Sequence, residues 1–253
     1  MVQFSRLRRF ASALGTAAAL ALGTSFANAD VSNVIFEITA TNDLGSGTLQ
    51  FFVGDGTLEP DTFTWFLPGA TAITNGSGDE IATLTSGNVF CVFDGLDPSI
   101  SLGFSVLSGG GANPTMFTIN SPLLSFSPIP NAQAVAGGAL TVSDTPPGQG
   151  ATLMGGLPSG RAYLTQYNGF VPNGTTFAEL VDTIVAPPNG SNSMPMNTGL
   201  TNLNTTVNDM SAQLKFSVTP GDIASGTTTY AVIPEPASLA LLGLAFVGFA
   251  RRR

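Results

Sequence analysis

The sequence contains no histidine. A Ser-His-Asp or Cys-His catalytic arrangement therefore cannot be built, and histidine-ligated zinc or iron is excluded. The chain has a single cysteine, Cys91, so no intramolecular disulfide can form. Cys91 is flanked by Phe90 and Val92, whereas a nucleophilic thiol needs a base or positive charge close by. We expect a buried structural cysteine.

Positive charge is almost absent from the central part of the chain. Of the eight basic residues, three lie within the first nine positions and three are the last three residues. Between positions 30 and 233 only Arg161 and Lys215 stand against fifteen acidic residues, a formal charge of −13. A nucleic-acid partner is excluded because the region has no basic surface for phosphate, and binding to anionic lipid is disfavoured for the same reason.

The first 29 residues have the three parts of a secretory signal peptide. A basic segment with Arg6, Arg8 and Arg9 precedes the apolar stretch 10–22. Ala27 and Ala29 fit the small-x-small rule for signal peptidase, which places the mature N-terminus at Asp30. We expect residues 1–29 to form a signal helix that directs the chain into the general secretory route and is then removed.

The last twenty residues combine a short motif, an apolar segment and a basic end. The fourteen apolar or small residues at 237–250 would form a helix of about 21 Å, a marginal span for a hydrocarbon core of about 30 Å. Three arginines would hold that end on the cytoplasmic side. Before the apolar segment, two prolines stiffen an exposed stretch of backbone, and a glutamate between them is accessible to a processing enzyme. The motif consists of Pro234, Glu235 and Pro236, and the basic end of Arg251, Arg252 and Arg253.

This C-terminal arrangement resembles the PEP-CTERM sorting signal of Gram-negative bacteria. The resemblance covers residues 234–253 and includes the Leu-rich run 239–244. It implies recognition by an exosortase, a membrane cysteine transpeptidase, after transient anchoring in the inner membrane. It further implies release or re-anchoring at the cell surface or in extracellular polymer. The other interpretation of the same residues is an ordinary short C-terminal anchor that is never cleaved.

Between the two ends, apolar residues alternate with polar ones at the period of a β-strand. Apolar runs or alternating segments occur at spacings of roughly ten residues, separated by turns rich in glycine, proline and asparagine. This pattern predicts an all-β fold, a single antiparallel β-sandwich over residues 30–233, with a jelly-roll order favoured over an immunoglobulin-like one. Strands are expected near 34–41, 49–53, 63–67, 81–84, 89–93, 100–106, 117–119, 140–142, 161–167, 213–218 and 227–232.

Three segments have other patterns. Phe177, Leu180, Val181 and Ile184 follow helical spacing, and Thr176 with Glu179 forms a capping-box pair, which predicts one short helix. Residues 86–88 are expected to form a hairpin turn. Residues 187–204 are polar and aperiodic, which predicts a mobile loop.

Several side chains are candidates for chemistry, each with a structural alternative. The acidic turns offer weak calcium candidates in Asp94 with Asp97 and in Asp79 with Glu80. The carboxylates of Asp55, Glu59 and Asp61 could form a glycosidase pair, although aspartates in turns usually bind their own backbone. Trp65 is either a sugar-stacking platform with Phe63 and Phe66 or, as we favour, a core residue. Arg161, Tyr163 and Tyr167 are expected on a solvent-exposed strand face.

These observations predict an exported protein that is not an enzyme and needs no cofactor. Its expected partners are signal peptidase, the inner membrane in passing, exosortase and extracellular polysaccharide. We expect a structural component of the cell surface or extracellular matrix; the alternative is a carbohydrate- or calcium-dependent adhesion module.

Overall fold

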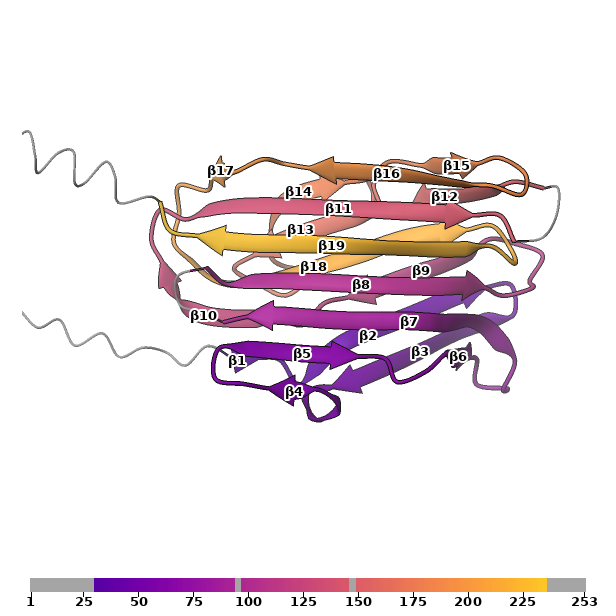
Figure 1. Cartoon of the computed structure of the whole chain (residues 1–253), viewed down its shortest axis with the longest axis horizontal. Helices are drawn as coiled ribbons and strands as arrows, with labels where there is room; N and C mark the ends of the chain where they lie inside the picture. The colour runs from indigo at the N-terminus through magenta and orange to yellow at the C-terminus, as the bar shows by residue number, and fades with distance from the viewer. Residues whose placement is uncertain (1–29, 94–96, 146–148, 236–253) are drawn as a thin grey trace, which may run out of the picture.

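The computed structural model describes residues 30–93, 97–145 and 149–235. These residues form two antiparallel β-sheets that pack face to face as a sandwich (Figure 1). The only helical element among them is a short 3-10 turn, η1 (Val53–Asp55). The expectation of an all-β antiparallel sandwich is confirmed.

The sheet nearer the viewer in Figure 1 is called the front sheet. Its main path runs in the order β16-β11-β19-β8-β7-β5-β4, with β17 added on β11 and β6 on β7. Its members are β4 (Thr57–Leu58), β5 (Thr62–Phe66), β6 (Thr71–Thr74), β7 (Glu80–Val92), β8 (Ser99–Ser108), β11 (Gln133–Ser143), β16 (Ser191–Asn197), β17 (Thr201–Asn202) and β19 (Ile223–Ile233).

The other sheet is called the rear sheet, and its main path runs β1-β10-β18-β9-β2-β3. On the other side of β18 lie β12 and β13, which pair in turn with β15 and β14. Its members are β1 (Asp30–Val31), β2 (Val34–Asn42), β3 (Gly45–Phe52), β9 (Thr115–Asn120), β10 (Leu124–Ile129), β12 (Ala151–Gly155), β13 (Tyr163–Tyr167), β14 (Thr175–Leu180), β15 (Ile184–Ala186) and β18 (Val207–Val218).

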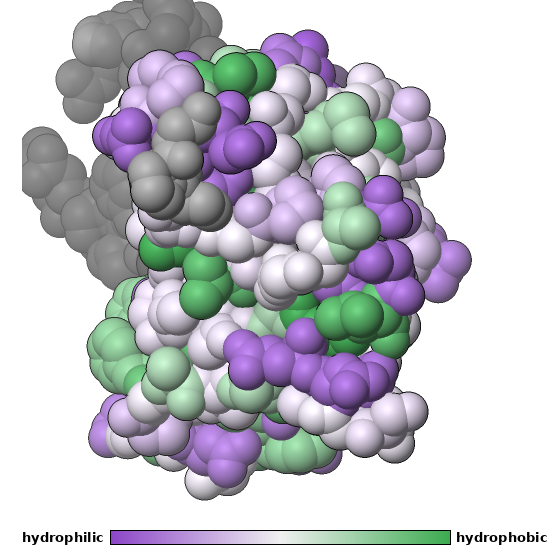
Figure 2. All heavy atoms as spheres, turned by 90° about the vertical axis from the view of Figure 1, so that its right-hand side faces the viewer, coloured by the Kyte–Doolittle hydropathy of each residue, from purple (hydrophilic) through white to green (hydrophobic). Residues whose placement is uncertain are grey.

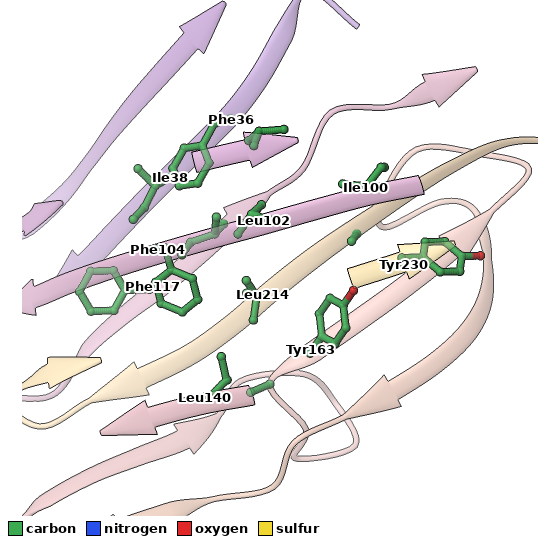
Figure 3. Close-up of a cluster of buried hydrophobic side chains, with 14 of the residues drawn as sticks. Phe36, Ile38, Ile100, Leu102, Phe104, Phe117, Leu140, Tyr163, Leu214 and Tyr230 are labelled. Atoms are coloured by element: carbon green, nitrogen blue, oxygen red, sulfur yellow. The ribbon is translucent and has the colours of Figure 1, made fainter. Parts of the chain in front are cut away.

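The hydrophobic core lies between the two sheets, where alternate residues of each strand point inward (Figure 3). In β8 the inward residues Ile100, Leu102 and Phe104 are at most 4% exposed. Phe104 stacks on Phe216 of β18 with ring centroids 5.5 Å apart, which joins the two sheets at their centre. The alternation of apolar and polar residues over 100–106 and 213–218 predicts these inward faces in β8 and β18, and the burial of the apolar residues confirms both.

The predicted helix over residues 177–184 is wrong, because the structure has β14 and β15 there. Thr165 pairs with Ala178 and Gln166 with Thr176, so Phe177 is an extra residue in the ladder. This β-bulge and the turn before Ile184 break the alternation of the strand. Inward residues are consequently spaced three and four apart, as they would be on a helix.

The mobile loop expected at 187–204 and the hairpin turn expected at 86–88 are also wrong. Half of the former segment is β16 and β17, and β16 pairs with β11 from Ser191 opposite Ser143 to Asn197 opposite Gly137. Residues 86–88 lie inside the continuous strand β7, where a register shift next to Thr85 bends the strand without reversing it.

Candidate functional site

The sorting motif begins directly after a strand that is central to the front sheet. Ile233, the last residue of β19, pairs with Gln133 of β11. The amide of Val232 donates a hydrogen bond to the carbonyl oxygen of Pro98 at 3.0 Å. Pro234 and Glu235 follow without regular structure and are half-exposed. Pro236, the expected membrane helix 237–250 and Arg251, Arg252 and Arg253 lie outside the described residues.

The mature N-terminus expected at Asp30 coincides with the start of the first strand. Asp30 is exposed and pairs with Ser125 of β10. Ala27 and Ala29 lie outside the described residues, as does the rest of the expected signal helix. The strand ends at Asp30 and Ile233 lie at the same end of the sandwich, on the left in Figure 1. Among the described residues, no helix is long and apolar enough to cross a membrane.

The calcium candidates do not form a cation site among the described residues, where no group of three or more acidic or cysteine side chains is gathered. Asp79 accepts a hydrogen bond from the Nδ2 atom of Asn75 at 3.0 Å. The Oδ1 atom of Asn75 in turn accepts hydrogen bonds from the amides of Ser77 and Asp79, both at 2.9 Å. Glu80 accepts a hydrogen bond from the hydroxyl of Thr83. Asp97 is exposed, and Asp94 lies outside the described residues.

Three of the side chains considered for chemistry have structural roles in this fold, whereas Glu59 and Asp61 are exposed. Cys91 is fully buried, and the loss of solvation raises the pKa of its thiol to about 12. Trp65 is 2% exposed and packs against Phe36 and Phe51 with ring centroids 5.2 and 4.6 Å apart. It is a core residue and cannot form a sugar-stacking platform. Asp55 accepts a hydrogen bond from the amide of Phe52 at 2.8 Å and so closes its own turn.

The solvent-exposed face expected for Arg161, Tyr163 and Tyr167 is wrong for Tyr163, and Tyr167 is half-buried against the hydrophobic core. This residue is 1% exposed, and its hydroxyl donates to the carbonyl oxygen of Thr229 across the sandwich at 3.2 Å. Burial raises the pKa of Tyr163 well above its ordinary value. Arg161 precedes β13 and forms an ion pair with Asp182 at 2.7 Å.

Two hollows were not anticipated from the sequence. One, of about 660 Å³, lies where β7 begins and β8 ends, and its lining includes Glu80, Leu107, Thr145 and Ile223. This is the end of the sandwich away from Asp30 and Ile233, where hydrophilic and hydrophobic residues are interspersed (Figure 2). The other, of about 340 Å³, lies on the outer face of the front sheet across β7, β8, β19 and β11. Each hollow is lined by residues that the register between strands brings together, and no local sequence pattern reveals that register.

Comparisons with known proteins identify only the C-terminal end. Among solved structures, a chain in the structure of the infectious bursal disease virus Gx strain has 13% sequence identity to this chain. The match covers 81% of this chain and 59% of that chain, with a TM-score of 0.27. Xylanase 10B of Clostridium thermocellum, with its CBM22-1 and GH10 modules, is 10% identical, with 83% and 28% covered and a TM-score of 0.27. The VP2 subviral particle of infectious bursal disease virus is 10% identical, with 83% and 71% covered and a TM-score of 0.23.

The chain thus spans less than two thirds of the first two structures that it matches, and no inference about it follows from these similarities. No match was found among the curated proteins. Residues 232–253 match the family described as the PEP-CTERM protein-sorting motif. This match begins one residue before the end of β19 and includes Pro234, Glu235, Pro236 and the three terminal arginines. The chain therefore carries a PEP-CTERM sorting signal at its C-terminus.

Proposed function

We propose that this protein is exported, processed by exosortase at its C-terminal sorting signal, and displayed at the cell surface or in the extracellular matrix as a non-enzymatic structural component. The observation that carries the proposal is the sorting motif over residues 232–253. An N-terminal segment with the pattern of a signal peptide supports it.

The position of the motif is compatible with release of an intact sandwich. Ile233 still pairs with β11, whereas Pro234 and Glu235 have left the sheet. Cleavage after Glu235 would leave every residue of β19 in place. Processing would therefore change the location of the domain without cutting into its core.

The same boundaries define the proposed domain organisation. Residues 1–29 are the signal peptide, 30–233 the β-sandwich ectodomain and 234–253 the sorting signal, with its membrane helix at 237–250 and its arginine tail at 251–253. The pairing supports a jelly-roll order for the ectodomain. In the front sheet, neighbouring strands run in the order β8-β19-β11-β16. In the rear sheet, which packs against it, β9 and β10 lie on one side of β18, and β12 and β13 lie on the other.

The alternative function is a carbohydrate- or calcium-dependent adhesion module. The hydrogen bonds of Asp79 and Glu80 within their own segment do not favour calcium. The hollow on the outer face of the front sheet does favour a carbohydrate partner, because it is lined by hydroxyl and amide side chains. A structural component that binds matrix polymer would unite the two functions.

Cell fractionation tests the proposal. Immunoblots of cytoplasm, envelope, surface extract and medium are compared between the native host and a strain that lacks exosortase. We expect the protein at the surface or in the medium of the native host and its accumulation in the envelope of the deletion strain. A protein that stays in the cytoplasm would end the proposal.

Two single substitutions, one in the motif and one outside it, test whether the motif itself causes this result. Glu235→Ala should also cause accumulation in the envelope, because the displayed carboxylate would be lost from the recognition strip. Glu59→Ala is the matched control, since Glu59 is exposed and also precedes a proline. Equal behaviour of the two variants would show that Glu235 takes no part in recognition.

A further inference from the structure

The front sheet is almost free of charge in a strongly acidic protein. Its nine strands contain a single charged residue, Glu80, at the first position of β7. The strands of the rear sheet contain five: Asp30, Glu37, Glu179, Asp209 and Lys215. A ligand on the outer face of the front sheet therefore meets neither an ion-pairing partner nor a local field of carboxylates.

Two rows of small polar residues cross this outer face. The ladder aligns Ser86, Ser105, Ser225, Thr141 and Ser193 on five neighbouring strands. The next row on the same face aligns Asn88, Gly103, Thr227, Ala139 and Pro195. Neighbouring strands lie about 4.8 Å apart, so each row offers polar groups at a regular spacing.

The hollow of about 340 Å³ lies along these two rows. The side chain of Asn88 lies over Gly103, with its Oδ1 atom 2.3 Å from where a Cβ atom would be, so only a glycine leaves room for this amide in the hollow. Within the part of the chain that the structure describes, the amide of Asn88 and the hydroxyls of Ser225 and Thr227 make no side-chain hydrogen bond. These groups remain available to a ligand.

Two exposed aromatic rings lie beside the hollow. Phe66 of β5 is 68% exposed and pairs with Asn88, while Phe90 of β7 is 41% exposed and follows two residues later on the same face. Their inward neighbours Trp65 and Cys91 are buried, which fixes the outward direction of both rings. Apolar ring faces next to hydroxyl and amide groups match a sugar, which has apolar C–H faces and a rim of hydroxyls.

We propose that the outer face of the front sheet binds an uncharged polysaccharide. The chain of sugars lies across β7, β8, β19 and β11, with its hydroxyls on Asn88, Ser225 and Thr227 and a sugar ring against Phe90. The absence of charge on this face argues for a neutral polymer, since an anionic one would meet no cation there and a formal charge of −13 on residues 30–233 would repel it. This inference rests on the proposed location, which brings the protein into contact with extracellular polymer.

The test uses the full-length protein in detergent, co-sedimented with insoluble cellulose and insoluble β-1,3-glucan, and assayed by affinity electrophoresis in gels with soluble xylan or alginate. We expect binding to at least one of the neutral polysaccharides and none to the anionic alginate. Asn88→Ala and Phe90→Ala should each weaken that binding by about tenfold. Thr227→Asp should weaken it at least as much, because it buries a carboxylate under the ligand.

Thr48→Asp is the matched control. Thr48 is an exposed strand threonine on the rear sheet, and its replacement changes the net charge by the same amount. It should retain binding to the neutral polysaccharide. Circular dichroism and the melting temperature of each variant show whether it folds. If Thr227→Asp does not fold, Phe90→Ala still tests the inference, because Phe90 is exposed and its replacement leaves the core unchanged.

Three results would overturn the inference. The protein could bind none of the neutral polymers, it could bind alginate as well as them, or the control could lose binding as Thr227→Asp does. A fourth contrary result is dimerisation in analytical ultracentrifugation that Thr227→Asp abolishes, which would make the face a contact between copies. Each of these leaves the proposed export intact, because export is decided by the fractionation of cells with and without exosortase.

Discussion

At the scale of single residues, the buried thiol of Cys91 sets a pH dependence. Its pKa of about 12 in the folded chain lies above an ordinary value of about 9. Below pH 9 both the folded and unfolded states hold the proton, and the contribution to stability is constant. Above pH 9 only the unfolded state loses it, so the free energy of unfolding falls by up to ~1.4 kcal/mol per pH unit. Cys91→Ala should show a shallower fall between pH 9 and 10 in urea titrations. Identical slopes would contradict this burial.

Adjacent aromatic residues provide a second prediction at this scale. Trp65 packs on Phe36 and Phe51 in the core, whereas Phe66 points into solvent. Trp65→Ala should lower the free energy of unfolding by about 3–5 kcal/mol, and Phe66→Ala should change it by at most about 0.5 kcal/mol. Denaturant unfolding followed by circular dichroism measures both. Comparable losses at the two positions would place the ring of Trp65 outside the core.

At the scale of elements, the close contact between β19 and β11 depends on a glycine. A Cβ atom at Gly226 would stand 2.3 Å from the Cδ2 atom of Leu140 and 2.9 Å from the carbonyl oxygen of Ala139. Gly226→Ala should therefore destabilise the fold by about 1–3 kcal/mol. At Gly76 no atom lies within 4 Å of such a Cβ, so Gly76→Ala should change stability by at most about 0.5 kcal/mol. Equal melting temperatures for Gly226→Ala and the original protein would contradict the packing.

The elements also show how far sequence reasoning reaches in this fold. Strands with strict alternation, such as β8 and β18, were predicted with the correct inward face because burial on one side imposes period two. The prediction of a helix was wrong at Phe177 because a bulge inserts one residue and imitates helical spacing. Pro195 concealed β16, although an edge strand tolerates proline. The polar hollow could not be predicted, because it depends on pairing between strands as distant as β7 and β11.

At the scale of the whole molecule, two features bear on the function: the position of the strand ends next to the processing signals and the distribution of charge between the two sheets. The strand ends at Asp30 and Ile233 lie at one end of the sandwich (Figure 1). Most of the acidic residues that the structure describes lie in turns or on strands of the rear sheet. Processing at the C-terminus would thus act at one end and leave the front sheet accessible. The resemblance to a sorting signal was confirmed by the family match over residues 232–253, whereas the tail beyond Glu235 lies outside the described residues.

The central claim is that this tail is removed by exosortase during export, and the intact mass of the exported protein tests it most directly. The protein is purified from the surface extract and medium of cells with exosortase and from the envelope of cells without it. The account predicts that the protein from the first cells begins at Asp30 and lacks Arg251, Arg252 and Arg253, and that the protein from the second retains them. A mass that includes Arg253 in exported protein from cells with exosortase would contradict the account.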